Sequence, residues 1–179
     1  MARRRKAKKL KEVKVQVFGE KDPANHDPYK LLKEIIEKWH THLANAKIAL
    51  AWNQAWKADV DGILHLGHAK KATDLDYALH GRDFILQLNR DVWESVGWTE
   101  KQARALLDHL LCHCDVRRDS DGAPMEDEHK RTIWRVRKHD VEEFKEVLAH
   151  HGTWIGSIAD CVRAAVRADK QPLLEKKGA

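Results

Sequence analysis

The spacing of apolar residues changes along the first two thirds of the chain, and this change constrains the fold more than any other feature. Residues 29–43 (YKLLKEIIEKWHTHL) place apolar side chains three or four positions apart, which predicts an amphipathic helix. Asp27-Pro28 precedes it, as an N-cap followed by a proline in the first turn. Short apolar or alternating stretches at 46–53, 63–71 and 82–91 then predict three strands, although the first of them also fits a helix.

Helical spacing returns at residues 100–114 (EKQARALLDHLLCHC). Thr99 and Gln102 have the spacing of a capping box in front of this helix. The elements expected after it are a polar loop or hairpin turn at 115–128, a strand at 131–137, a helix from Asp140 to Gly152, and a last amphipathic helix at 154–170. The pattern therefore predicts an α+β fold, with an N-terminal helix and a small sheet of three or four strands.

The chain has the length of one domain with short appendages, at 179 residues. We expect a flexible basic leader at 1–27, a folded domain at 28–154, and a C-terminal helix and tail at 155–179. No run approaches 18 apolar residues, which argues against a membrane span, and the first residues lack the apolar stretch of a secretory signal. Three cysteines are too few for a disulfide framework, so we expect a cytoplasmic protein.

Two histidines stand four residues apart in the helix predicted at 100–114. His109 and His113 therefore share one helix face, a spacing at which two imidazoles can bind one metal ion. The same spacing also fits two polar residues that border the apolar stripe. His139 is a candidate for the third ligand, because it lies where the predicted strand meets the next helix; it equally fits a residue that merely precedes Asp140 as N-cap.

Three sequence blocks in this order resemble the putative phage metallopeptidase family. They are DFILQLN at 83–89, ALLDHLLCH at 105–113 and RKHDVEEF at 137–144, and the resemblance extends over about residues 30–154. It implies a compact zincin-like fold related to SprT-like peptidases, in a protein of the bacterial host cell if phage-encoded. It also implies one zinc ion bound by His109, His113 and His139, since the family's metal-binding helix carries His-Glu-x-x-His with a third histidine downstream.

The glutamate of that motif is absent, because position 110 is a leucine. A zincin needs this carboxylate as the general base that takes a proton from the metal-bound water, and leucine cannot accept one. Loss of a general base typically lowers the rate by about 10²–10⁴-fold. We therefore expect an impaired or inactive peptidase, a pseudoenzyme, with Asp140 as the best available substitute base. A Cys112, His113 and Cys114 zinc site is the rival arrangement, although the two cysteines diverge by about 200° on a helix.

The positive charge of the chain is concentrated in its first residues. Of the net charge of +5, residues 1–14 carry +7 from eight basic residues and one acidic residue, which leaves −2 for residues 15–179. Such an arm either binds phosphate backbones or remains a solvated tail. The alternative function is thus a non-catalytic zinc-containing module that contacts DNA or a host protein through its tail and cleft. The DNA-contacting residues would include Arg3, Arg4, Arg5, Lys6, Lys8 and Lys9.

Overall fold

The structure is a computed structural model that describes residues 14–142 and 145–170. Contacts within the chain define two units, Met1–Arg137 and Lys138–Ala179. The fold is α+β, as predicted from the spacing of apolar residues. None of the helices within the described residues is long and apolar enough to span a membrane.

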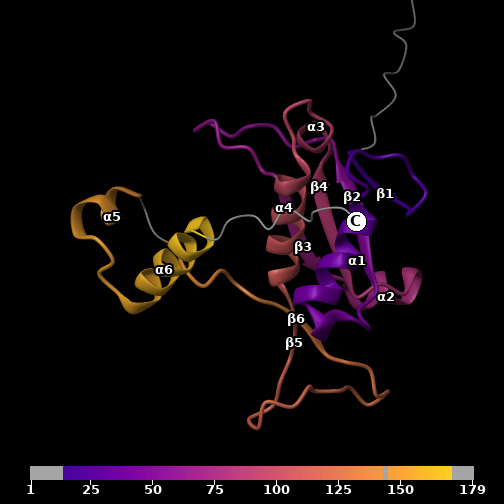
Figure 1. Cartoon of the computed structure of the whole chain (residues 1–179). Helices are drawn as coiled ribbons and strands as arrows, with labels where there is room; N and C mark the ends of the chain where they lie inside the picture. Colours follow the sequence, from indigo (N-terminus) through magenta and orange to yellow (C-terminus); the bar gives the residue numbers. More distant parts are fainter. Residues whose placement is uncertain (1–13, 143–144, 171–179) are drawn as a thin grey trace, which may run out of the picture. The chain divides into compact units, whose positions relative to one another are not determined.

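A mixed sheet of four strands forms the framework of the first unit (Figure 1). Its strands are β1 (Val15–Phe18), β2 (Ile48–Asn53), β3 (Gly67–Lys71) and β4 (Phe84–Asn89), in the spatial order β1-β2-β4-β3. The two central strands, β2 and β4, are parallel, and both edge strands pair antiparallel to their neighbours. The three strands predicted between residues 46 and 91 are therefore confirmed.

Strand β1 corrects the expectation of a flexible leader for residues 15–18. Val15 and Val17 alternate with polar residues, and this short alternating stretch pairs with β2, from Val15 opposite Asn53 to Phe18 opposite Leu50. The Phe18 ring stacks on Trp52 at a centroid distance of 4.2 Å. The backbone of β1 gains ladder hydrogen bonds with β2, and its Phe18 gains the aromatic pair with Trp52. Together these contacts stabilise residues 15–18 as a strand.

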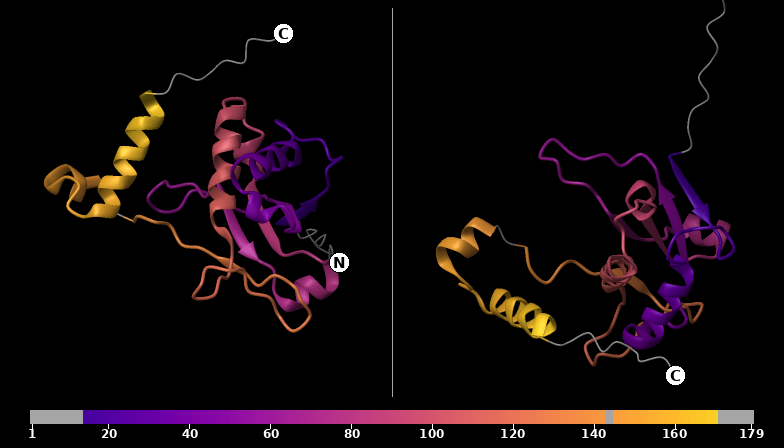
Figure 2. Two further views of the ribbon diagram at one scale, coloured as in Figure 1. Left: turned by 60° about the horizontal axis from the view of Figure 1, so that its bottom comes forward. Right: turned by 45° about the horizontal axis from the view of Figure 1, so that its top comes forward.

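Two long helices, α1 (Pro28–Trp39) and α4 (Glu100–Cys112), lie side by side and share one core with the sheet (Figures 1 and 2). The side chain of Asp27 accepts a hydrogen bond from the backbone N–H of Lys30, which confirms the predicted N-cap. The core combines apolar residues of both helices with those of the central strands: Leu31, Leu32, Ile35, Leu50, Trp52, Phe84, Leu86, Leu88, Leu107, Leu110 and Leu111.

Several short elements of this unit were not predicted from the sequence. They are the 3-10 helix η1 (Thr41–Leu43), the helices α2 (Asp74–His80) and α3 (Arg90–Trp93), and the strand β5 (Cys114–Val116). Strand β5 pairs antiparallel with β6 (Trp134–Val136), so the residues between them form the connection of a hairpin. The strand predicted at 131–137 is confirmed by β6.

The second unit contains α5 (Lys145–His151) and α6 (Gly156–Lys170). The prediction of a helix that starts at Asp140 is wrong for the described residues 140–142, which are not helical. An N-cap residue is only a weak local signal, which tertiary context can override, and the helix described after it is α5. The predicted end at Gly152, which has a φ of +64°, and the predicted last helix are both confirmed.

Candidate metal centre

Helix α4 carries the predicted histidine pair near its C-terminal end. The capping box at its start is present: the Thr99 side chain accepts a hydrogen bond from the Gln102 backbone, and the Gln102 side chain accepts one from the Thr99 backbone. The helix ends at Cys112 with His113 as C-cap, so His109 and His113 lie one turn apart, their ring centroids separated by 5.0 Å. The negative end of the helix dipole favours a cation at this position.

A pair of hydrogen bonds ties His113 to the end of β6. The backbone N–H of Arg137 donates to the His113 carbonyl at 2.8 Å, and His113 Nδ1 lies 2.7 Å from the Arg137 carbonyl oxygen. Because a carbonyl oxygen can only accept, Nδ1 of His113 carries the proton. In the neutral ring the lone pair is then on Nε2, which is the state of a metal-ligating histidine whose other nitrogen donates to the backbone.

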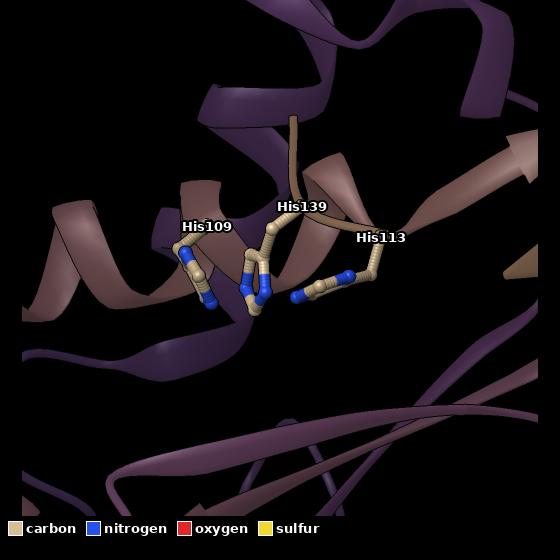
Figure 3. Close-up of side chains that lie close together, drawn as sticks. All are labelled: His109, His113 and His139. Atoms are coloured by element: carbon tan, nitrogen blue, oxygen red, sulfur yellow. The ribbon is translucent and has the colours of Figure 1, made fainter. Parts of the chain in front are cut away.

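The third predicted ligand, His139, follows the β5–β6 hairpin in the sequence. His139 follows Arg137 by two residues, so the chain itself limits its distance from His113, although the division between the two units falls between Arg137 and Lys138. Ligand nitrogens of His109, His113 and His139 all lie within 4.8 Å of one another. Figure 3 shows the ring of His139 between the other two rings. The structure thus brings together the three predicted ligand residues.

The donor set fits a metal ion that prefers nitrogen ligands. Three imidazoles are the protein ligands of many catalytic zinc sites, where the fourth position is left to water. His109 and His139 are exposed and His113 is half-buried, so the three nitrogens are open to solvent on one side. A carboxylate that was not predicted also lies nearby, since Glu142 Oε1 is 3.9 Å from His139 Nδ1.

Leu110 takes no part in this arrangement. Its side chain is only 1% exposed, and a Cβ added at Gly67 of β3 would lie 2.9 Å from Leu110 Cδ1. The leucine therefore packs between α4 and β3, within the apolar core. Asp140, the predicted substitute base, is exposed.

The rival site of two cysteines and His113 has no support in the structure. Cys114 is 1% exposed, and its Sγ lies 3.5 Å from the carbonyl oxygen of Leu110 inside the core. Burial raises the pKa of the Cys114 thiol to about 12, helped by the neighbouring Cys112, so the thiolate needed for ligation is disfavoured. Cys112 is exposed and belongs to a different group of side chains.

Two features remain: the basic residues predicted near the N-terminus, and a contact of His40 with Asp108 that was not predicted. The basic residues proposed to contact DNA, Arg3 to Lys9, lie outside the described residues. Sequence reasoning missed the contact of His40 with Asp108, at 2.6 Å between Nε2 and Oδ1. Asp108 and Cys112 have the same four-residue spacing as the histidine pair, which is a local signal, but no local pattern points to His40.

Most of this chain matches a model of a known protein family. The family model described as "Putative phage metallopeptidase" matches residues 23–168. Searches of the curated proteins and of the solved structures each found no match. The matched residues include the whole of α4 and all three histidines, and they make up most of the sequence. The chain therefore belongs to the putative phage metallopeptidase family.

Proposed function

We propose that this protein binds zinc in a zincin-like site, where His109, His113 and His139 share one ion. The observation that carries the proposal is the convergence of the three imidazoles, with Nδ1 of His113 held by a backbone carbonyl. The nitrogen-only donor set favours zinc over magnesium or calcium, which prefer oxygen ligands. When bound with an open coordination position, zinc lowers the pKa of a coordinated water.

We further propose that peptide hydrolysis is impaired at the step that requires a general base. The position that carries this base in the family's motif is filled by Leu110, which is buried against β3. Exposed carboxylates of Asp140 and Glu142 follow His139, and Glu142 Oε1 is 3.9 Å from the His139 ring. A relocated base would be one of these two residues.

Metal analysis of the purified protein tests the zinc site. We expect His109→Ala and His139→Ala each to hold about one zinc per chain less than the parent, because each removes one of three ligands. His129→Ala is the matched control, since His129 lies on an exposed turn outside the group and its loss should leave the zinc content unchanged. A folded protein whose zinc content is the same in His109→Ala as in the parent would disprove the site.

Peptide cleavage tests the second part of the proposal. We expect the zinc-loaded protein to cleave casein no faster than His109→Ala does. Cleavage that is abolished both by chelator and by His109→Ala would contradict this expectation and show that another base is present. Comparison of Asp140→Asn with Glu142→Gln would then identify it, because the amide of either variant cannot accept the proton from water.

The alternative role is a non-catalytic module that contacts DNA or a host protein. It is favoured by the concentration of positive charge in residues 1–14, whose net charge is +7. The loss of the general base and the retention of three metal-binding histidines are compatible with such a role. Its test is duplex-DNA binding measured with and without residues 1–14.

A further inference from the structure

A second group of metal-binding side chains lies entirely within the first unit. It consists of His40, Asp108 and Cys112, whose ligand atoms all lie within 4.8 Å of one another. His40 is the C-cap of α1 and is buried, at 7% exposure. Asp108 and Cys112 lie one turn apart on α4, where Asp108 is half-buried and Cys112 is exposed. The group therefore joins the two long helices that pack side by side.

This group is separate from the histidine trio. Asp108 precedes His109 by one residue and Cys112 precedes His113 by one residue, so each pair is rotated by about 100° around the helix axis from the other. The two groups consequently occupy neighbouring faces of the same helix and share no ligand residue. An ion bound by one group would therefore leave all three ligand residues of the other group available.

We propose that His40, Asp108 and Cys112 form a second binding site for a zinc-like divalent cation. An imidazole nitrogen, a carboxylate oxygen and a thiolate sulfur are all ligands that zinc accepts, and the sulfur disfavours magnesium and calcium. None of the three cysteines is in a disulfide, so the sulfur of Cys112 is in the thiol oxidation state. The fourth coordination position would be open to water, because Cys112 is exposed.

The geometry requires only a small adjustment to admit the ion. With metal–ligand distances of about 2.0–2.3 Å, neighbouring ligand atoms in a tetrahedral site stand about 3.3–3.7 Å apart. His40 Nε2 and Asp108 Oδ1 are 2.6 Å apart, at hydrogen-bonding distance, and must separate by about 0.7 Å. The carboxylate can make this movement because the Asp108 side chain is 39% exposed, whereas the His40 side chain is held at 9% exposure.

The consequence of binding is a clip between the end of α1 and the last turns of α4. The ion would replace a single hydrogen bond between the helices by three coordination bonds, and binding to the folded state alone raises stability. Because α4 also carries the histidine pair, this clip holds the helix on which the first site is built. An ion in the second site would thus stabilise the packing of α4 against the end of α1.

Cobalt(II) distinguishes the second site from the first by its colour. Cobalt substitutes for zinc, and a thiolate ligand produces an intense near-ultraviolet charge-transfer band that histidine ligands do not. We expect the metal-free full chain to develop this band on titration with cobalt, and Cys112→Ser to lose it. Cys161→Ser is the matched control, since Cys161 is also exposed but lies on α6, outside the group. The charge-transfer band of this variant should equal that of the parent.

Further variants separate this inference from the proposed zinc site. His109→Ala should keep the band because it removes a ligand of the histidine trio only. Asp108→Asn and His40→Gln should weaken cobalt binding at the thiolate site by at least about tenfold, with an unchanged far-ultraviolet circular dichroism spectrum confirming the fold. The proposal is overturned if the parent shows no band, if the band survives Cys112→Ser, or if folded Asp108→Asn binds cobalt as tightly as the parent.

Discussion

Leu110 is the residue at which packing and catalysis make opposite demands. A general base at this position of the motif would have to reach the water on the metal, but the side chain faces β3 and is 1% exposed. A carboxylate there would be buried without a cationic partner, at a cost of about 3–5 kcal/mol. We therefore expect Leu110→Glu to lower the free energy of unfolding by about this amount and to create no peptidase.

Urea denaturation of Leu110→Glu checks this expectation, and Leu110→Met is its matched control. Methionine conserves volume and polarity, so its cost should stay below about 1.5 kcal/mol. A glutamate variant as stable as the parent would mean that the side chain at position 110 can turn toward solvent. Peptide cleavage gained by that variant would then show that the site lacked only its base.

At the scale of the elements, the contact between α4 and β3 depends on a glycine. A Cβ at Gly67 would lie 2.9 Å from Leu110 Cδ1 and 3.1 Å from the backbone oxygen of Gln87. The neighbouring strand cannot yield as a flexible side chain would, so Gly67→Ala should destabilise the protein by about 1–3 kcal/mol. Gly97→Ala is the control, because nothing lies within 4 Å of its added Cβ, and thermal denaturation of the two variants should separate them clearly. Equal melting temperatures would contradict the close approach of α4 to β3.

How far the elements could be predicted depends on the range of the interactions that fix them. The capping box of α4 connects residues three positions apart, and its apolar stripe is a local period, so sequence alone predicts this helix and the face that carries His109 and His113. The contact of His40 with Asp108 joins residues 68 positions apart, and no local pattern encodes it. Asp140 resembles an N-cap locally, but residues 140–142 are not helical, because a capping residue is a weak local signal that tertiary context can override.

At the scale of the whole molecule, the metal-binding groups are separate in sequence from the positively charged residues 1–14. Both groups use α4, a central helix of the first unit. The net charge of +7 on residues 1–14 contrasts with −2 on the remainder. Electrostatic attraction to a polyanion should therefore depend on the first fourteen residues and be independent of metal occupancy. This separation allows the two proposed properties, metal binding and DNA binding, to be removed one at a time.

Deletion of residues 1–14 tests the DNA-binding role. The full chain should bind duplex DNA with an affinity that falls steeply as salt rises, because each basic residue that contacts a phosphate releases a counterion. The deletion should weaken binding at least about tenfold at low salt and flatten the salt dependence. As a control for length, glutamine at the six positions Arg3, Arg4, Arg5, Lys6, Lys8 and Lys9 should have nearly the same effect. His109→Ala should leave DNA binding unchanged. Fluorescence anisotropy with a labelled duplex measures all four proteins, and an affinity unaltered by the deletion would exclude the N-terminal segment as the DNA-contacting surface.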